Sequence, residues 1–430
     1  MRRGFFVIFM IAFMFLTAGN IVADNQVFID YWIGTIRVMD TEMEIHIEIE
    51  EQDSRYSGLI SIPEQFQYDL ELSDLEVDYP EISFVLEAGS RATFQGSMKD
   101  GYISGNFSQS GINGLFHLVR GEKERLRREP VELSPLKGEQ EIEVPTTYGI
   151  LSGSLVLPNS GERYPLVIIV AGSGPTDRDG NNPLIAGKGY VYRQIAEKLR
   201  EFGIATLRYD KRGIGKSSDS LQREEDIRFD YFVQDVISWI ELFQEDERFN
   251  KILILGHSEG SLLGILAAGQ TEVDGLISAA GAGRNMADVL MEQFSRQPEP
   301  YRAEGEEIIS SLREGNMVSD ISEELHSAFR PSIQPYLISC MQYDPAVEIS
   351  KLNIPILIIQ GTNDIQISVD DAQKLAESNE SAELVIIEGM NHMFRTSSTE
   401  LQENMKTYGD PELPFTEGFI ESLISFVNKI

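Results

Sequence analysis

A serine flanked by glycines is the clearest chemical signal in the sequence. Residues 256–260 read G-H-S-E-G, directly after the apolar run 252–255 and before the helical run 261–268. A serine on such a strand-to-helix turn has a strained backbone and an exposed hydroxyl, and small glycines let neighbouring chains approach it closely. G-x-S-x-G often occurs by chance, but both flanking contexts are present here. The pattern predicts that Ser258 is a nucleophile rather than a structural turn residue.

A serine hydroxyl is a poor nucleophile until a base takes its proton. The chain holds five histidines, which are His46, His117, His257, His326 and His392. The first two fall in a β-rich region, the third adjoins the serine and should point away from it, and the fourth lies in a helical insertion. His392 remains, in a loop after the apolar run 384–387, and we predict that it is the base.

The base needs a carboxylate that fixes its tautomer and stabilises the imidazolium. Asp364 ends the G-T-N-D loop at 361–364, just after the apolar run 354–360, and gives the chain order Ser, Asp, His. Glu388 is the reserve candidate, and a turn-forming role for Asp364 is the alternative. We expect Ser258, Asp364 and His392 to form a catalytic triad.

A tetrahedral oxyanion needs two preorganised hydrogen-bond donors. One should be the backbone amide of Glu259, directly after the nucleophile, and the other an amide in the glycine-rich loop 171–175. We predict Ser173 for the second donor, because its glycine neighbours permit the required turn. Gly172 stays open as the alternative.

The elements that must position these residues follow an α/β pattern. Near-continuous apolar runs alternate with helical segments, as in a doubly wound, mostly parallel sheet covered by helices on both faces. The interval 284–348 is helical in pattern and predicts a lid inserted above the carboxyl ends of the strands. The predicted strands are 166–171, 204–209, 251–256, 275–279, 354–360 and 384–387.

The N-terminal part of the chain has a different pattern. Residues 43–50 alternate apolar and polar at every step, as a half-buried strand requires. Asp100 and Gly101 suit a tight hairpin turn between two further strands. We therefore expect a small all-β domain over 24–120.

A charged segment containing Pro130, Pro135 and Gly138 resists regular structure and predicts a linker over 121–143. The α/β catalytic domain should then cover 144–430. Two domains suit a chain of 430 residues.

The first residues predict a signal peptide over 1–23. Two arginines precede twelve apolar residues and then a small, polar stretch. Export to the periplasm or the extracellular space is expected, without stable membrane insertion after cleavage; an N-terminal membrane anchor is the alternative. The single cysteine, Cys340, excludes an internal disulfide and should be a buried, inert thiol.

The charge balance limits the partners of the protein. With 69 acidic and 36 basic residues, the formal charge of -33 repels nucleic-acid phosphates, so no nucleic-acid partner is expected. G-K-S at 215–217 is not a phosphate loop, because Asp210 stands where the glycine is required. Residues 177–180 lack the spacing of a calcium loop. We expect no metal and no cofactor, and a small-molecule acyl ester as substrate.

Four motifs resemble those of bacterial α/β-hydrolase esterases of the EstD type. They are A-G-S-G-P-T-D-R-D-G at 171–180, R-Y-D-K-R-G-I-G-K-S at 208–217, the pentapeptide at 256–260, and Y-D-P at 343–345 leading to G-T-N-D at 361–364. The resemblance covers 144–430 and, more loosely, the β-rich region. It implies a carboxylesterase with Ser258, Asp364 and His392 at the triad positions. Ala171 stands where many lipases have a His-Gly pair, which leaves the second oxyanion donor open.

Two other classes of function fit the same residues. The triad could serve a peptidase, a thioesterase or an acyltransferase, since these share the acyl-enzyme chemistry. Alternatively, the β domain could capture a lipid or a sugar in a non-catalytic binding protein, because fold alone does not decide function. The oligomeric state is not readable from the sequence.

Overall fold

The computed structural model describes most of the chain, in two units. Unit 1 comprises Met1–Ile60, Asp69–Glu87 and Arg91–Glu124, and unit 2 comprises Ser61–Tyr68, Ala88–Ser90 and Arg125–Ile430. The predicted signal peptide and most of the predicted linker lie outside the described residues. In the part that is described, no helix is long and apolar enough to cross a membrane. The described residues are 25–38, 41–52, 55–62, 67–88, 90–109, 112–121, 134–159, 161, 163–182, 187–221 and 223–430.

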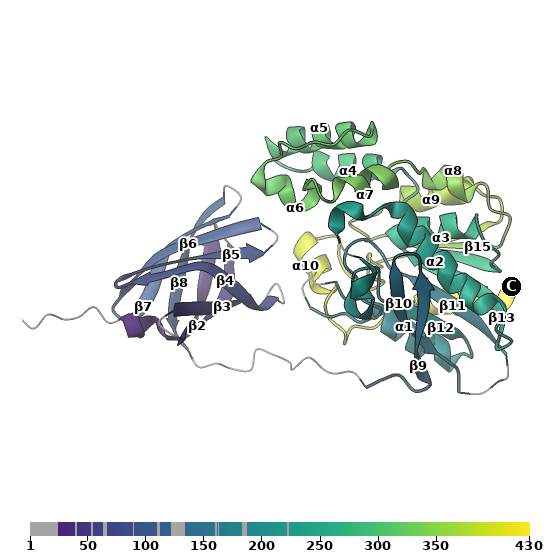
Figure 1. The fold of residues 1–430 in the computed structure, drawn as a ribbon, viewed down its shortest axis with the longest axis horizontal. Helices are drawn as coiled ribbons and strands as arrows, with labels where there is room; N and C mark the ends of the chain where they lie inside the picture. The colour runs from purple at the N-terminus through teal and green to yellow at the C-terminus, as the bar shows by residue number, and fades with distance from the viewer. Residues whose placement is uncertain are drawn as a thin grey trace, which may run out of the picture. The chain divides into compact units, whose positions relative to one another are not determined.

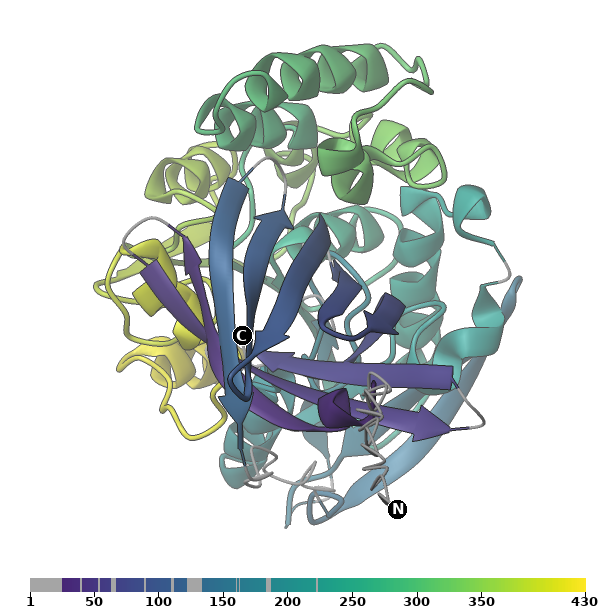
Figure 2. The same cartoon turned by 90° about the vertical axis from the view of Figure 1, so that its left-hand side faces the viewer.

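Unit 1 is a closed barrel of eight strands preceded by a short helix, η1 (Asn25–Phe28) (Figures 1 and 2). The first strand pairs antiparallel with both the second and the eighth, which closes the sheet on itself. The predicted all-β fold of this region is confirmed. The strands are β1 (Asp30–Val38), β2 (Thr41–Gln52), β3 (Arg55–Ile62), β4 (Gln67–Asp78), β5 (Glu81–Ala88), β6 (Ser90–Lys99), β7 (Tyr102–Gln109) and β8 (Ile112–Arg120).

The barrel interior is packed with large side chains. Phe84 and Phe94 stack with ring centroids 4.6 Å apart, and Phe116 meets both rings edge-on. The predicted hairpin turn joins β6 to β7, where Asp100 and Gly101 both adopt positive φ. These three aromatic rings are almost fully buried, so they form part of a hydrophobic core inside the barrel.

Unit 2 is built on an eight-stranded sheet in the order β16-β15-β14-β13-β11-β12-β10-β9. From β12 to β16 the neighbouring strands run parallel, whereas β10 is antiparallel to both β9 and β12. All six strands predicted in this region are present. The strands are β9 (Glu139–Thr146), β10 (Gly149–Val156), β11 (Tyr164–Val170), β12 (Ala205–Tyr209), β13 (Phe249–His257), β14 (Gly275–Ala279), β15 (Ile356–Gly361) and β16 (Ala382–Ile387).

Helices cover both faces of this sheet, as the apolar runs predicted. Along β11, Leu166, Ile168 and Val170 join one buried cluster, and the alternate residues Val167 and Ile169 join another. The first cluster includes side chains of α2, α3, α8 and α9, and the second those of α1 and α11. These helices are α1 (Val191–Glu201), α2 (Phe229–Gln244), α3 (Glu259–Ala268), α8 (Pro345–Ile349), α9 (Val369–Glu377) and α11 (Phe419–Lys429).

The interval predicted to be a helical insertion, between β14 and β15, is helical (Figure 1). Its helices have a small core of their own that includes Ile309, Leu312 and Phe329. The remaining short helices lie elsewhere in unit 2: η3 (Gly215–Ser220), η4 (Glu224–Asp226) and α10 (Leu401–Lys406). The helices of the insertion before α8 are α4 (Met286–Ser295), α5 (Tyr301–Arg313), η5 (Glu323–Leu325), α6 (His326–Phe329) and α7 (Gln334–Cys340).

The start of the sheet differs from the sequence-based boundary. β9 begins at Glu139, inside the segment 121–143 predicted as a linker. It is an edge strand in which Val144 is the one fully buried residue, so its sequence carries little apolar signal. Charged side chains are the usual composition of an exposed sheet edge.

Candidate active site

Ser258 lies on a sharp turn between β13 and α3. Its backbone has φ 55° and ψ -120°, an unusual conformation for a residue other than glycine. The flanking glycines are required by close contacts: a Cβ on Gly256 would lie 2.3 Å from the carbonyl oxygen of Gly260, and one on Gly260 would lie 2.2 Å from that of Val170. The turn leaves Ser258 half-buried at the start of a helix. This is the geometry that the G-x-S-x-G pattern predicts.

His392 and Asp364 form a buried pair. The Nδ1 atom of His392 lies 2.8 Å from Oδ2 of Asp364, and both side chains are almost fully buried. Burial by itself would raise the pKa of Asp364, but the charge and hydrogen bond of His392 and the amides of Ile367 and Gln366 together lower it below the usual aspartate value. An ionised Asp364 makes Nδ1 of His392 the protonated nitrogen and leaves Nε2 to accept a proton.

The Ser258 turn and the His392 loop are in direct contact. The residue before the serine, His257, places its Nε2 atom 3.0 Å from the carbonyl oxygen of His392, and the two rings are 4.9 Å apart. Ser258 itself makes no hydrogen bond to His392 in the described part of the chain. Such bonds are often long in unliganded hydrolases and tighten when substrate binds. The structure thus brings the three predicted triad residues to one edge of the sheet.

His257 has both ring nitrogens occupied. Its Nδ1 atom lies 2.8 Å from the hydroxyl of Tyr192, which accepts a hydrogen bond of 3.1 Å from the amide of Gly172. The Tyr192 proton is therefore available to Nδ1, and Nε2–H donates to the His392 carbonyl. Burial, reinforced by His392, lowers the pKa of His257 to about 3. His257 is a neutral structural link rather than a second base.

This neutral histidine should make the protein sensitive to acid. The unfolded chain takes up a proton near pH 6.5, whereas folded His257 does so only near pH 3. Its contribution to the free energy of unfolding is therefore complete above pH 6.5 and falls by about 1.4 kcal/mol per pH unit below it. When the pH is lowered from 7.5 to 5, the free energy of unfolding of the wild-type protein should fall by about 2 kcal/mol more than that of a His257→Gln variant.

Urea unfolding checks this expectation. The chain has two tryptophans, Trp32 in unit 1 and Trp239 in unit 2. A Trp32→Phe background makes fluorescence report on unit 2 alone. Equal losses of stability in the variant and its parent would show that His257 carries a proton in the folded state at pH 5.

The predicted oxyanion donors belong to two segments next to the nucleophile, the start of α3 and the loop after β11. A Cβ on Gly172 would lie 3.2 Å from Cβ of Ser258, so the glycine-rich loop packs against the serine. The Gly172 amide is engaged by Tyr192, whereas the amides of Ser173 and Glu259 have no acceptor among the described residues. The Glu259 amide also begins α3, where the helix dipole favours negative charge. This arrangement favours Ser173 over Gly172.

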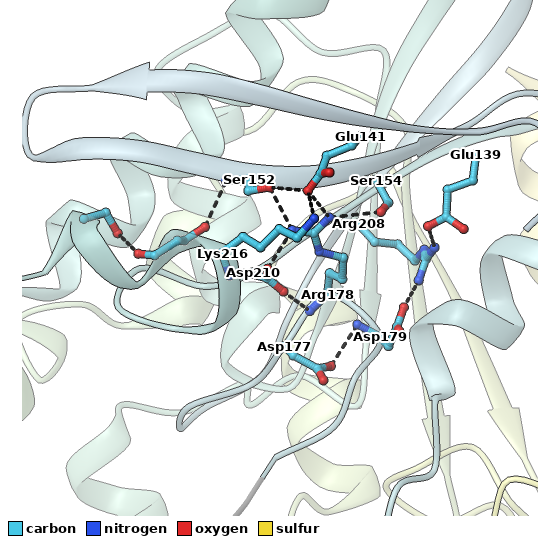
Figure 3. A network of polar contacts seen from close by, with 12 residues as sticks. Glu139, Glu141, Ser152, Ser154, Asp177, Arg178, Asp179, Arg208, Asp210 and Lys216 are labelled. Atoms are coloured by element: carbon cyan, nitrogen blue, oxygen red, sulfur yellow. Dashed lines mark hydrogen bonds and ion pairs between the residues drawn. The ribbon is translucent and has the colours of Figure 1, made fainter. Parts of the chain in front are cut away.

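The loop after β11 is held by the polar network in Figure 3. The guanidinium of Arg178 donates to Asp210 at 2.7 Å, to Ser152 at 2.8 Å and to Ser154 at 3.1 Å. Asp210 accepts a further bond of 2.9 Å from the amide of Arg178. The network ties the loop to β10 and to the end of β12, so it fixes the segment that carries the predicted second oxyanion donor.

A second part of the same network uses Arg208. This fully buried side chain on β12 pairs with Glu139 at 2.7 Å and with Asp179 (Figure 3). Asp177 accepts backbone bonds from Asp179 and Asn181, at 2.9 and 2.8 Å. The carboxylates of 177–180 thus serve loop and ion-pair contacts, and no group of three metal-ligating side chains occurs in the described ranges.

Two buried residues beside the site were not predicted from the sequence. Tyr192 binds the Gly172 amide, and Lys211 donates to the Gly172 carbonyl oxygen at 2.8 Å. In the sequence, Lys211 stands out only as part of the motif at 208–217, and Tyr192 belongs to no motif. The position of Lys211 at the carboxyl end of a parallel strand was the one available signal.

The order of the strands and the strand-to-helix turn at Ser258 give unit 2 the α/β-hydrolase fold. Residues 186–397 match the family model described as "Serine aminopeptidase, S33". The resemblance to EstD-type esterases is confirmed by a match to "Esterase EstD" of Thermotoga maritima, 25% identical over 259 residues, or 57% of this chain. The chain spans 58% of the length of that relative.

Other matches are more distant. A "Monoglyceride lipase homolog" of Monkeypox virus is 22% identical over 267 residues, covering 56% of this chain and 87% of its own length. Among solved structures, Est1E from Butyrivibrio proteoclasticus with bound ferulic acid is 19% identical to this chain, with a TM-score of 0.46. The match covers 67% of this chain and 96% of Est1E.

Proposed function

We propose that this protein is a serine carboxylesterase that works through an acyl-enzyme on Ser258. The observation that carries the proposal is the buried pair of His392 and Asp364, 2.8 Å apart, whose loop contacts the strained serine turn. Two backbone amides next to this serine turn, those of Ser173 and Glu259, have no acceptor among the described residues. The match to an esterase and to a hydrolase family model supports hydrolytic chemistry.

The proposed reaction has two proton transfers in each half. Ser258 Oγ attacks the acyl carbon of the ester while Nε2 of His392 takes the hydroxyl proton. The amides of Ser173 and Glu259 hold the oxyanion. The tetrahedral intermediate then expels the alcohol, which receives its proton from His392. Water then attacks the acyl-enzyme and gives a proton to His392. The second tetrahedral intermediate breaks its bond to Ser258 Oγ, which takes this proton from His392, and the acid is released.

Peptidase activity is the second candidate, because the matched family model is described as a serine aminopeptidase. An aminopeptidase must bind the ammonium group of its substrate, which calls for an unpaired carboxylate near the nucleophile. The carboxylate next to the serine, Glu259, already pairs with Lys211 at 3.2 Å and accepts from Tyr336. This pairing favours an uncharged ester over a free amino terminus.

A substrate panel tests the proposal. Purified protein is assayed with p-nitrophenyl esters of short to medium chain length, acyl thioesters and aminoacyl p-nitroanilides, and is labelled with a fluorophosphonate probe. We expect probe labelling at Ser258 and kcat/KM for the best ester at least about 100-fold above that for any anilide. A preference for anilides would support the peptidase, and the absence of both labelling and turnover would support a non-catalytic binding protein.

We also propose that the protein is exported. The support is the sequence of 1–23, in which two arginines precede an apolar run and a small, polar stretch. An N-terminal membrane anchor is the alternative. Cell fractionation with detection of the mature N-terminus by mass spectrometry distinguishes a cleaved chain from an anchored one.

A further inference from the structure

Lys211 is a buried lysine that touches both sides of the candidate oxyanion site. It follows β12 and is 5% exposed. Its Nζ atom donates to the carbonyl oxygen of Gly172 at 2.8 Å and to Oε1 of Glu259 at 3.2 Å, and it lies 4.9 Å from the ring centroid of Phe232. One ammonium group thus contacts the residue before one predicted oxyanion donor and the residue that supplies the other.

The contact with Gly172 acts on the amide of Ser173. The Gly172 carbonyl and the Ser173 N–H belong to the same planar peptide unit, and in a trans peptide they point in opposite directions. Holding the carbonyl on the Lys211 side therefore turns the Ser173 N–H away from Lys211. A positive charge on the carbonyl oxygen also polarises the peptide, which makes its N–H a stronger donor.

The rest of this peptide is fixed as well. The amide of Gly172 donates to Tyr192 at 3.1 Å, so the backbone is held on both sides of the Gly172 Cα atom. Without these contacts, a glycine between Ala171 and Ser173 would have many conformations to choose from. Preorganised donors are effective because they need no reorientation as charge develops in the transition state.

On the other side, Lys211 acts through the side chain of Glu259. This carboxylate is buried, and it also accepts a hydrogen bond from Tyr336 of α7. The amide of Glu259 is the first of α3, so anchoring its side chain fixes the start of that helix. A single ammonium group thereby links the two segments that carry these amides.

We propose that Lys211 is a positioning residue that orients and polarises the oxyanion donors Ser173 and Glu259. The inference rests on the proposed function of the same site. It predicts that Lys211 stabilises the transition state far more than the bound substrate. A purely structural ion pair would instead affect folding without changing turnover per folded molecule.

The test compares Lys211→Met/Glu259→Gln with Glu259→Gln alone. The double variant avoids leaving an unpaired buried carboxylate, and both variants keep the Glu259 backbone amide. Relative to the single variant, kcat for the best p-nitrophenyl ester should fall by about 10- to 100-fold, and KM should change by less than about threefold. The Ki of an alkyl trifluoromethyl ketone, which forms a tetrahedral adduct with the serine, should rise by a similar factor.

Active-site titration gives the concentration of functional enzyme for each variant, and thermal melting shows whether the variant is folded, so kcat is compared per folded molecule. Lys351→Met, an exposed lysine paired with Glu348, is the surface control and should leave kcat unchanged. If the double variant does not fold, Lys211→Gln is measured instead, and kcat should fall by at least about fivefold because the amide is shorter and uncharged.

The two proposals fail in distinguishable ways. The double variant is compared with Glu259→Gln, and Lys211→Gln, where it is used instead, is compared with the wild type. If kcat and the affinity for the ketone stay unchanged and only the melting temperature falls, Lys211 is structural and the inference is wrong. If the wild-type protein shows neither ester turnover nor fluorophosphonate labelling, the proposed function is overturned and this inference falls with it.

Discussion

Replacing Ser258 by alanine is expected to lower the kcat for ester hydrolysis by about 10⁴-fold or more. The reason is that alanine removes the only atom that can form the acyl-enzyme, while the oxyanion amides and the buried pair of His392 and Asp364 stay in place. Residual turnover should match the modest effect of a polarised carbonyl attacked directly by water. Steady-state assays on purified enzyme, normalised by protein mass, measure the change.

A matched control separates chemistry from folding. Ser310→Ala removes an exposed hydroxyl that donates to the carbonyl oxygen of Glu306 within α5. This change should leave both kcat and the melting temperature unchanged. Ser258→Ala should also melt like the wild type, since the hydroxyl takes part in no hydrogen bond within the described ranges and alanine meets the same positive φ. Retention of more than about 1% of wild-type kcat would contradict the proposed mechanism.

That the three candidate triad residues share one edge of the sheet could be predicted, because each of them lies in a recognisable local context. Ser258 occupies a glycine-flanked turn, and Asp364 and His392 follow apolar runs that had to be parallel strands. Once the strands are parallel, their carboxyl ends meet at one edge of the sheet, so residues far apart in sequence become neighbours. Elimination among five histidines then left one candidate base.

The contacts that hold the site could not be predicted in the same way. Lys211, in the loop after β12, and Tyr192, on α1, contact the backbone of Gly172, and nothing in their local sequence shows that they are buried there. A lysine in a loop motif is normally exposed, so its burial depends on three-dimensional packing. The hydrogen bond between Tyr336, on α7 of the insertion, and Glu259 could not be predicted from the sequence either.

The limits of strand prediction have a physical cause as well. The central strands are apolar on both faces and were all found, whereas β9 and β10 were missed. β9 lies at the sheet edge and buries little, so its charged sequence resembled a linker. β10 contains two serines and a glycine among its buried residues, which weakens the apolar signal on which strand prediction depends.

Replacing Asp364 by asparagine is the second change with a large expected effect, again about 10⁴-fold in kcat. In the wild type, Oδ1 of Asp364 accepts the amides of Gln366 at 2.8 Å and Ile367 at 3.0 Å, and Oδ2 faces His392. A backbone N–H group can only donate a hydrogen bond, so the side-chain oxygen of asparagine must take the position of Oδ1, where it accepts these two amides. Its NH₂ group then points at Nδ1 of His392 as a donor.

This reversal determines the tautomer of the base. Facing a donor, Nδ1 of His392 becomes the acceptor, and the ring proton moves to Nε2, which can no longer take the proton of Ser258. The side chain of Gln360 donates to Oδ2 of Asp364 and to the carbonyl oxygen of Ile367, both at 3.0 Å, so it loses the first bond and keeps the second when asparagine presents a donor. The fold should therefore tolerate the change while turnover does not.

The reserve carboxylate supplies the matched control. Glu388 is exposed and lies closer in sequence to His392 than Asp364 does, so Glu388→Gln tests whether proximity in sequence matters. We expect Glu388→Gln to keep wild-type kcat while Asp364→Asn loses it at equal melting temperature. The carboxylate that sets the tautomer of His392 must be the one whose loss disables the base. If Glu388→Gln lost activity and Asp364→Asn kept it, Glu388 would orient His392, and the contact of 2.8 Å between Asp364 and His392 would be only structural.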